Sequence, residues 1–453
     1  MNIIVIGAGR MGQSLAGRLI EEGHSVTVVD WDPNKIEHIS TNYDVMALQG
    51  NGADYEVLTE AGAEDADLLL AVTSDDAVNM LCCLTARKLG VGNTVARVRT
   101  MEYFRQLVFF KEELGLSLVF NPEHDAAAEI SRILRIPSAA KVESFAKGRA
   151  EMVEFTITAG MPICGMKLSQ LGGRYGSGIL ISAVQRNSDV VIPTGSYTLE
   201  AGDVVHVVGA PAKMSAFFKA IGTHKRSVRD VMILGGGRIS LYLGRELIDA
   251  GIRVKIIEED EEHCETIKEI LPKAEVLLGD GTDPRLLEEE GIRTTDAFVA
   301  LTGSDQNNII TSMFAARSGA GKVITKINQE VFRTMVGSHK LDSFVTPTSI
   351  ASDNIVQYVR AMQNSLDASG IESLHEIADG KAEVIEFLIR KDAPYLNISL
   401  RDLKIGHDTL LAAIIRGNTC IIPGGNDVIR LHDSVIAVTA RFGIQRFSDI
   451  FQE

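Results

Sequence analysis

Several features that would define other classes of protein are scarce or missing in this sequence. Only five of its 453 residues are cysteines, and none are spaced as C-x-x-C, which is typical of reduced thiols and not of a disulfide framework. No apolar run approaches the ~20 residues of a membrane-spanning helix. The first strand-like segment begins at Asn2 and leaves no room for a secretory signal. We therefore expect a cytoplasmic protein that does not cross a membrane.

An excess of basic residues is also absent. The chain has 45 Lys and Arg residues against 60 Asp and Glu residues, a net charge of −15. Proteins that bind nucleic acids usually carry a basic face, because contacts with phosphates dominate their affinity. The small basic cluster at 224–229 is more typical of an exposed linker between domains. The charge balance thus argues against a nucleic-acid partner.

What the chain does contain is an internal duplication. Ile3–Gly12 reappears as Val231–Ser240, each an apolar strand followed by a Gly-x-Gly turn, and the likeness continues to the end of the chain. The length suggests about three or four domains at roughly 150 residues each, and the duplication favours four. Other matching residues are Gly50 and Gly279, Asn79 and Asn308, Arg186 and Arg416, Pro193 and Pro423, and Asp203 and Asp433.

Strands and helices alternate in the first part of each repeat. Continuous Val, Leu and Ile runs predict parallel strands that helices cover on both faces, whereas the second part has short β runs between turn signals. The expected fold class is α/β, with two doubly wound parallel Rossmann-like sheets, each followed by a small α+β domain. The expected domains are residues 1–136 and 228–348 (Rossmann-like) and residues 137–222 and 366–450 (small).

The glycine turn of the first copy has the pattern of a dinucleotide-binding site. Gly7 permits the tight turn, Gly9 lets the backbone approach a pyrophosphate, and Gly12 lets the following helix pack close to the strand. Asp30 ends the second strand, where its carboxylate would accept hydrogen bonds from the ribose hydroxyls and repel a 2′-phosphate. The pattern therefore predicts nucleotide binding, with NAD preferred over NADP.

The second copy is less regular. Ser240 takes the place of the third glycine, and Lys326 takes the place of Arg97, while the first two glycines and the acid Glu258 remain. Phosphate approach and ribose contact are thus preserved, but packing and affinity are expected to differ, and its ligand need not be the same.

Further candidates repeat in both copies. The arginine of each glycine turn has two candidate roles: its side chain folds over the phosphates, or it is solvated. The basic residue at a strand end of each copy lies at the side of the sheet where open α/β folds bind ligands. Small residues just beyond another strand end either leave room for adenosine or cap the following helix. The residue between two glycines either lines the adenosine pocket or tolerates a left-handed turn conformation. The candidate cofactor-binding residues are Gly7, Ala8, Gly9, Arg10, Met11, Gly12, Asp30, Asn51, Gly52, Thr73, Ser74, Arg97, Gly235, Gly236, Gly237, Arg238, Ile239, Glu258, Asp280, Thr302 and Lys326.

The residues of an enzyme site are not recognisable. Hydride transfer needs a general acid or base near the substrate, yet His206 and His432 do not occupy matching positions, and no metal-ligand spacing occurs. We expect neither catalytic residues nor a metal site. The alternative is an NAD-dependent oxidoreductase with duplicated cofactor domains. A redox-sensing transcriptional regulator would need a basic face or a DNA-binding helix pair.

The order of parts resembles the RCK (KTN) module that regulates potassium conductance. Two such modules in one chain resemble the tandem RCK subunits of Trk-type potassium uptake systems, and the resemblance covers essentially the whole sequence. It depends on the combined order of parts, above all on Gly50–Gly52, on Gly279–Gly281 and on the Arg, Pro and Gly-Asp pattern in the segments Gly178–Leu180, Ala183–Arg186, Ile192–Pro193 and Gly202–Val208. The helices expected over 123–135 and 348–362 connect each Rossmann unit to its small domain.

This resemblance implies a regulatory subunit without enzymatic activity. It would bind NAD(H), with ATP or ADP as competing ligands, and lie peripherally on the inner face of the cell membrane. Its partner would be a Trk/Ktr-type membrane potassium-translocating subunit, whose K+ transport it would gate. By analogy the chains would form a ring, a homotetramer carrying eight RCK units.

Overall fold

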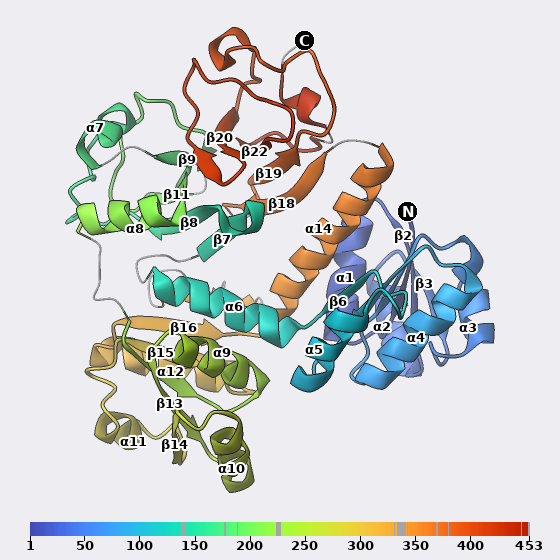
Figure 1. Ribbon diagram of the computed structural model, residues 1–453. Helices are drawn as coiled ribbons and strands as arrows, with labels where there is room; N and C mark the ends of the chain where they lie inside the picture. Colours follow the sequence, from blue (N-terminus) through green and yellow to red (C-terminus); the bar gives the residue numbers. More distant parts are fainter. Residues whose placement is uncertain are drawn as a thin grey trace.

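The computed structural model describes residues 1–136, 141–175, 178–187, 189–222, 228–329, 331–332, 341, 343–367, 370–378, 380–444 and 446–451. Two α/β units lie beside each other, and two β-rich domains form a lobe above them (Figure 1). Of the basic cluster predicted as a linker, 224–227 lie outside the described residues.

The first α/β unit is a doubly wound sheet, as the sequence predicts. Its six strands are parallel in the order β3-β2-β1-β4-β5-β6, the arrangement of dinucleotide-binding folds. The central strands β1 and β4 are almost wholly buried because helices cover both faces of the sheet, whereas the edge strand β3 is partly exposed. Its elements are β1 (Asn2–Ile6), α1 (Arg10–Glu21), β2 (Ser25–Asp30), α2 (Pro33–Asn42), β3 (Met46–Gln49), α3 (Tyr55–Glu60), β4 (Leu68–Ala71), α4 (Asp76–Leu89), β5 (Asn93–Arg97), α5 (Met101–Phe110), β6 (Leu118–Phe120) and α6 (Pro122–Arg135).

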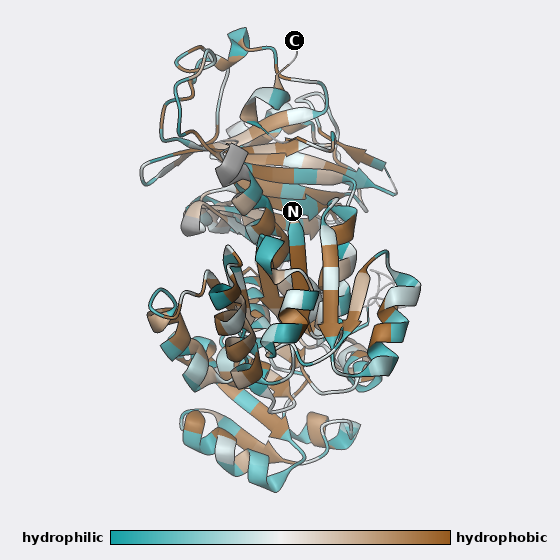
Figure 2. Cartoon of the chain, turned by 90° about the vertical axis from the view of Figure 1, so that its right-hand side faces the viewer, coloured by the Kyte–Doolittle hydropathy of each residue, from teal (hydrophilic) through white to brown (hydrophobic). Residues whose placement is uncertain are grey.

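The second α/β unit repeats this topology. Its strands are parallel in the order β14-β13-β12-β15-β16-β17. In Figure 2, hydrophobic colour concentrates on the strands and hydrophilic colour on the outer helices and loops. Its elements are β12 (Asp230–Leu234), α9 (Arg238–Asp249), β13 (Arg253–Glu258), α10 (Glu261–Ile270), β14 (Glu275–Leu278), α11 (Pro284–Glu289), β15 (Ala297–Ala300), α12 (Asp305–Ser318), β16 (Lys322–Lys326), β17 (Ser343–Val345) and α14 (Pro347–Asp367).

The two small domains are five-stranded sheets, ordered β10-β9-β11-β8-β7 and β18-β19-β22-β20-β21, in which all neighbouring strands are antiparallel. Residues from both sheets form one shared hydrophobic core, so the two domains pack against each other. Their elements are β7 (Lys141–Phe145), β8 (Ala150–Thr156), α7 (Leu171–Tyr175), β9 (Ile179–Arg186), β10 (Asp189–Val191), β11 (Val204–Gly209), α8 (Pro211–Ala220), β18 (Ile371–Ile377), β19 (Ala382–Leu388), β20 (Thr409–Arg416), β21 (Thr419–Ile421) and β22 (Ser434–Thr439).

The repeated Arg and Asp of the small domains form one ion pair in each. Arg186 binds Asp203 through two hydrogen bonds of 2.7 and 2.9 Å, and Arg416 binds Asp433 through two of 2.9 and 2.7 Å. Each arginine also donates to a backbone carbonyl in the loop that precedes the aspartate, Thr198 in the first domain and Val428 in the second. The repeat therefore preserves a structural clamp in each small domain.

The helices that leave the α/β units cross over between them. Helix α6 ends the first unit, yet Ala126, Ile130 and Leu134 share a core with the second sheet and α9. Helix α14 ends the second unit, yet Ala351 and Ile355 share a core with the first sheet and α1. Each crossing helix thus packs on the helix that follows the other unit's glycine turn, which joins the two units tightly.

Among the described residues, no helix is both long and apolar enough to cross a membrane.

Candidate nucleotide-binding site

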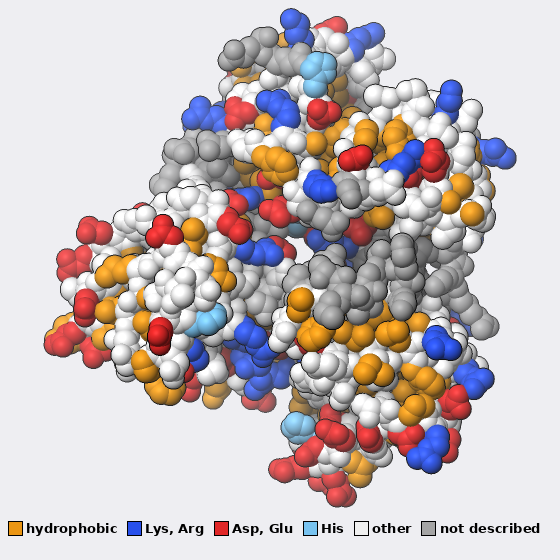
Figure 3. Space-filling view, turned by 180° about the vertical axis from the view of Figure 1, so that it is seen from behind, with side chains coloured by type: hydrophobic (Ala, Val, Ile, Leu, Met, Phe, Trp, Pro, Cys, Tyr) orange, Lys and Arg blue, Asp and Glu red, His pale blue; other side chains and the backbone are white. Residues whose placement is uncertain are grey.

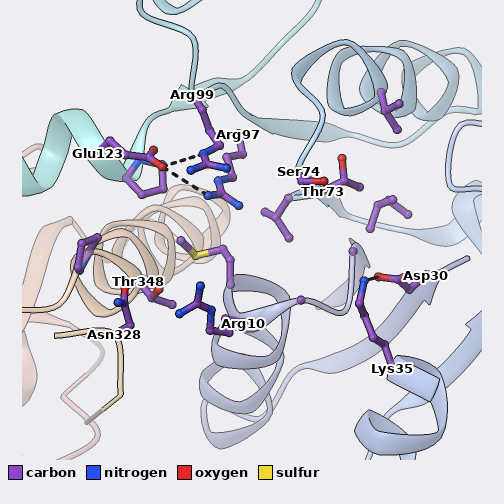
Figure 4. A pocket seen from close by; sticks show the side chains of 18 of the residues that line it. Arg10, Asp30, Lys35, Thr73, Ser74, Arg97, Arg99, Glu123, Asn328 and Thr348 are labelled. Carbon is purple, nitrogen blue, oxygen red and sulfur yellow. Dashed lines mark hydrogen bonds and ion pairs between the residues drawn. The ribbon is translucent and has the colours of Figure 1, made fainter. Parts of the chain in front are cut away.

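The carboxyl ends of both sheets open onto a single cavity of about 580 Å³ between the two α/β units (Figure 4). Its walls include the glycine turns at the start of α1 and α9. The N-cap residues of α1 and α9 are Gly9 and Gly237, and neither helix has a side chain that caps its free backbone N–H groups. By contrast, Asp32, Asp75 and Asn121 cap α2, α4 and α6. Both turns therefore present unsatisfied N–H groups, which suit a phosphate.

The glycines of the first turn have the geometry that such a turn needs. Gly7 has a φ of +105°, which favours glycine. A β-carbon on Gly12 would lie 1.7 Å from the Gly7 carbonyl oxygen, so only glycine lets α1 pack this closely. A β-carbon on Gly9 would meet nothing within 4 Å, and Gly9 lines the cavity. The backbone at Gly9 is therefore open to a ligand.

Asp30 joins the glycine turn to the end of β2. Its Oδ2 accepts a hydrogen bond of 2.7 Å from the Ala8 backbone N–H, and its Oδ1 accepts one of 2.9 Å from Asp32 N–H. Lys35 Nζ lies 3.7 Å from the same Oδ2. A carboxylate has about four lone-pair sites, so Asp30, which lines the cavity, can still accept hydrogen bonds from ribose hydroxyls.

The cavity is strongly basic although the chain is acidic. Among its lining side chains, six are basic and two are acidic. Glu123 Oε1 accepts a hydrogen bond of 2.7 Å from Arg99 and lies 3.8 Å from Arg97, and Figure 4 shows these side chains turned toward one another. The buried Nε of Arg97 has no hydrogen-bond partner among the described residues. The six basic residues are Arg10, Lys35, Arg97, Arg99, Arg238 and Lys326.

Burial disfavours the charged form of the basic residues at the two strand ends. Burial lowers the pKa of Arg97; Glu123 and Asp76 oppose the shift, whereas Arg99 and Arg238 add to it. Burial also lowers the pKa of Lys326; Asp305 and Glu123 oppose the shift, whereas Arg10 adds to it. Each glycine-turn arginine therefore approaches the strand-end cation of the other unit, and phosphates placed between them would relieve this repulsion.

A repeated asparagine holds the strand ends in both units. Asn79 donates hydrogen bonds to the carbonyls of Thr73 (3.2 Å) and Arg97 (2.9 Å). Asn308 makes the same bonds to the carbonyls of Thr302 (3.2 Å) and Lys326 (3.0 Å). The hydroxyl groups of both threonines bond to these asparagines. These contacts position the cations, so the asparagines belong to the scaffold of the site.

The second glycine turn keeps the hydrogen bonds of its acid and differs at the third glycine position. Glu258 Oε2 accepts a hydrogen bond of 2.6 Å from Gly236 N–H, and its Oε1 accepts bonds from Glu259 and Asp260 N–H. The Ser240 hydroxyl donates to the Gly235 carbonyl, and this contact accommodates the side chain that replaces the third glycine.

The cavity brings together most of the predicted residues, but the second unit contributes few of them, all from its glycine turn and from the end of β16. From the candidate set, it is lined by Gly7, Gly9, Arg10, Met11, Asp30, Asn51, Gly52, Thr73, Ser74, Arg97, Gly237, Arg238, Ile239 and Lys326. The candidates outside its lining are Ala8, Gly12, Gly235, Gly236, Glu258, Asp280 and Thr302.

In both copies, the side chain of the residue between two glycines accepts a hydrogen bond from the backbone N–H two residues later and so stabilises the turn. Asn51 Oδ1 accepts from Ala53 N–H at 3.1 Å, and Asp280 Oδ1 accepts from Thr282 N–H at 2.8 Å. Asn51 also lines the cavity, whereas Asp280 does not.

Sequence reasoning missed several lining residues. Arg99 and Glu123 come from the loop after β5 and the start of α6, and Asn328 and Thr348 come from matching places in the second unit. No motif marks them, because their position depends on the crossing of α6 and α14. Trp31 directly follows the predicted acid and could have been considered from that place alone.

The described residues contain no group of three or more His, Cys, Asp and Glu residues that could hold a metal ion. His206 lies on β11 and His432 in a turn with a φ of +69°, and neither lines the cavity.

Comparison with known proteins identifies the domains. The model of the TrkA-N domain matches residues 3–122 and 231–347, and that of the TrkA-C domain matches residues 152–222 and 384–452. The solved RCK domain of GsuK aligns with 96% of this chain and 92% of its own at a TM-score of 0.65 and 18% identity. The GsuK channel bound to NAD aligns with 97% of this chain and 76% of its own at a TM-score of 0.64 and 18% identity. These likenesses support the fold.

Relatives that match almost the whole chain indicate the same family as the domain matches. A Trk system potassium uptake protein TrkA homolog of Archaeoglobus fulgidus is 32% identical over 452 residues, 100% of both chains. The Trk system potassium uptake protein TrkA of Halomonas elongata is 33% identical over 442 residues, 96% of this chain and 95% of its own. With two TrkA-N and two TrkA-C domains in tandem, the chain belongs to the TrkA family.

Proposed function

We propose that this chain is a nucleotide-binding regulatory subunit that gates K+ transport through a Trk/Ktr-type membrane partner. Its relatives are named for potassium uptake, and a fold neighbour is a channel bound to NAD. The observation that carries the proposal is the single basic cavity shared by two crossed α/β units. A phosphate chain there would contact both units at once.

The residues of the cavity fit NAD(H), and ATP or ADP would compete for the same place. Asp30 would hold the ribose, the turn at Gly9 would hold the first phosphates, and Arg97 with Arg238 would neutralise the phosphates that reach between the units. Ligands with different phosphate chains would favour different separations of the two units. Such differential binding is what an effector needs in order to shift a conformational equilibrium.

Transmission from the cavity to a partner would use the crossing helices. Helices α6 and α14 begin at the cavity wall, at Pro122 and Pro347, and lead directly to the small domains. A change between the α/β units would therefore move the paired small domains. We propose that the protein acts on the cytoplasmic face of the membrane and assembles as a homotetrameric ring.

The test is K+ flux through vesicles that contain the membrane partner, measured without nucleotide and with NADH, ADP or ATP. We expect the flux to differ among ligands, and Arg238→Gln to reduce that difference. Arg390→Gln is the control, because Arg390 is an exposed arginine paired with Glu372 in a small domain, outside the cavity. Equal flux under all conditions would reject nucleotide gating. Steady oxidation of NADH would instead favour the alternative of an NAD-dependent oxidoreductase.

A further inference from the structure

The adenosine end of the cavity contains an exposed indole ring. Trp31 is the only tryptophan of the chain, and 74% of it is exposed. Single exposed apolar side chains are common and need no explanation by themselves. Trp31 differs because it lines the cavity and directly follows Asp30, the residue proposed to hold the ribose.

The indole lies on a well-fixed segment. Asp32 caps helix α2 through the Asn34 N–H at 3.0 Å, and Pro33 occupies the first helical turn. Lys35 Nζ lies 6.0 Å from the centre of the indole ring, at the outer range of a cation–π contact. The same Nζ is 3.7 Å from Asp30 Oδ2 and 3.9 Å from Asp32 Oδ2. Two carboxylates therefore hold the ammonium group beside the ring.

The second unit lacks both side chains. Glu259 stands at the position that matches Trp31, and His263 at the position that matches Lys35. Neither lines the cavity. Acidic residues also occupy each position from Glu258 to Glu262. A carboxylate offers no flat π-face to a base, so the two adenosine ends differ in chemistry although the two folds match.

We propose that the indole of Trp31, with Lys35 beside it, is the platform on which the adenine base stacks, and that it makes the first half of the cavity the adenine-binding half. This inference rests on the proposed binding of adenine nucleotides. The base is joined to the ribose that Asp30 would hold, so it must lie within a few ångströms of that residue. An aromatic face suits it because stacking requires no particular hydrogen-bond pattern.

The proposal also accounts for the use of one cavity by several ligands. NADH, ATP and ADP share the adenosine that the platform would hold, and they differ in the groups that reach toward the second unit. The first half would then supply the common affinity. The second half, with Arg238 and Lys326, would sense what distinguishes the ligands.

The single tryptophan makes the test direct. ATP is titrated into the full-length protein while its intrinsic fluorescence and the heat of binding are recorded. We expect ATP to change the fluorescence with the same Kd that calorimetry gives. Trp31→Glu, which introduces the second unit's residue, should weaken ATP binding about tenfold, whereas Trp31→Phe should weaken it about threefold or less. Glu259→Trp in the Trp31→Glu background places a tryptophan at the matching position of the second unit. It should restore neither the ATP-dependent fluorescence change nor the ATP affinity.

The outcomes are separable. Unchanged fluorescence at saturating ATP, or a Trp31→Glu variant with the affinity of the original protein, would overturn the platform. An equal loss in Trp31→Phe and Trp31→Glu would also overturn it, because a phenyl ring still stacks. Normal ATP affinity with altered K+ flux in Trp31→Glu would place the indole against the membrane partner instead. If no adenine nucleotide binds the original protein, the proposed function itself fails.

Discussion

At the scale of single residues, the site depends on groups that serve both the fold and the ligand. Asp30 fixes the glycine turn through Ala8 N–H and at the same time faces the cavity. Asn79 ties Thr73 and Arg97 together without lining the cavity itself. The effect of a substitution at such a position must therefore be compared with the effect of the same substitution at the matching residue of the other repeat. That residue makes the same structural contacts but does not line the cavity.

Asp30→Asn should weaken NADH binding by about tenfold or more. The amide can still accept from Ala8 N–H, but it loses the charge, and hydrogen bonds to charged groups contribute about 1.5–3 kcal/mol. Calorimetric titration of NADH measures the change. Glu258→Gln is the matched control, because Glu258 accepts the equivalent bond from Gly236 but does not line the cavity. Equal losses in both variants would contradict a ribose role specific to Asp30.

A second residue-scale prediction concerns His432. In the first small domain the matching residue is Gly202, with a φ of +93°, and His432 adopts the same left-handed region at +69°. This conformation costs a non-glycine residue roughly 1 kcal/mol. His432→Gly removes this cost, but glycine loses more conformational entropy on folding, which offsets part of the gain. We therefore expect the free energy of unfolding of the second small domain to rise by a few tenths to about 1 kcal/mol. A thermal melt that shifts downward would contradict this.

The sequence marks those residues of the glycine turn whose conformation or packing is fixed by local geometry. Gly7 and Gly12 were recognisable because a turn between strand and helix leaves only glycine acceptable there. Glu123 and Asn328 were not, since they reach the cavity only through contacts between distant segments. Their roles follow from the crossing of the helices, which no local pattern encodes.

At the scale of elements, the crossing helices explain how two similar units become one site. The sequence predicted helices over 123–135 and 348–362, and the structure has α6 at Pro122–Arg135 and α14 at Pro347–Asp367. An amphipathic pattern shows that a helix has a buried face, but not which sheet covers it. The packing of α6 on α9 and of α14 on α1 therefore had to come from the structure.

Helix α14 also meets a buried acid where it reaches the second small domain. Arg360 binds Glu22 at the end of α1 through two hydrogen bonds, and the Oε2 of the nearby Glu383 has no hydrogen-bond partner among the described residues. Glu383 lies on β19 and is 6% exposed. Burial raises its pKa from 4.5 to about 6; Arg360 opposes the shift, whereas Glu376 and Glu22 add to it.

This acid predicts a pH-dependent stability. The raised pKa means that the folded protein favours the protonated form of the Glu383 carboxyl group. The stability that protonation of Glu383 contributes is therefore fully present below about pH 4.5 and is lost as the pH rises through about 6. Glu383→Gln should therefore raise the free energy of unfolding at pH 8 by roughly 1 kcal/mol and change it little at pH 4.5.

Thermal melts at the two pH values measure this difference. The control is Glu151→Gln at the matching position of the first small domain, where Glu151 pairs with Arg135 at 3.3 Å. Loss of that pair should not stabilise the protein at pH 8. Stabilisation by both variants, or by neither, would show that the missing partner of Glu383 is unimportant.

At the scale of the whole molecule, charge is distributed unevenly. The chain carries a net charge of −15, but the cavity between the α/β units is basic. Figure 3 shows Lys and Arg side chains gathered where the first unit faces the second, and acidic side chains toward the outer ends of both units. Composition correctly predicted an acidic protein, but it could not place the basic residues in one cavity.

The outer surface of the first unit offers a test of the proposed ring. Helices α4 and α5 expose several large apolar side chains, among them Leu81 (51%) and Phe109 (77%), and Ile310 of α12 is exposed at the position that matches Leu81. An exposed apolar residue at the same place on both units suits a head-to-tail contact between the first unit of one copy and the second unit of the next. Contacts of that kind form a closed ring when the rotation between neighbouring copies closes.

We expect Phe109→Glu to shift the protein from a tetramer to smaller species, as measured by light scattering during size-exclusion chromatography. A charge at the centre of an apolar contact costs free energy in the assembly, whereas the same change on an exposed surface alters monomer stability by less than about 0.5 kcal/mol. Phe442→Glu is the matched control, because Phe442 is 61% exposed in the second small domain, away from α5. If both variants remain tetrameric, the ring uses another surface; if the original protein is monomeric at all concentrations, regulation through a ring of eight RCK units is wrong.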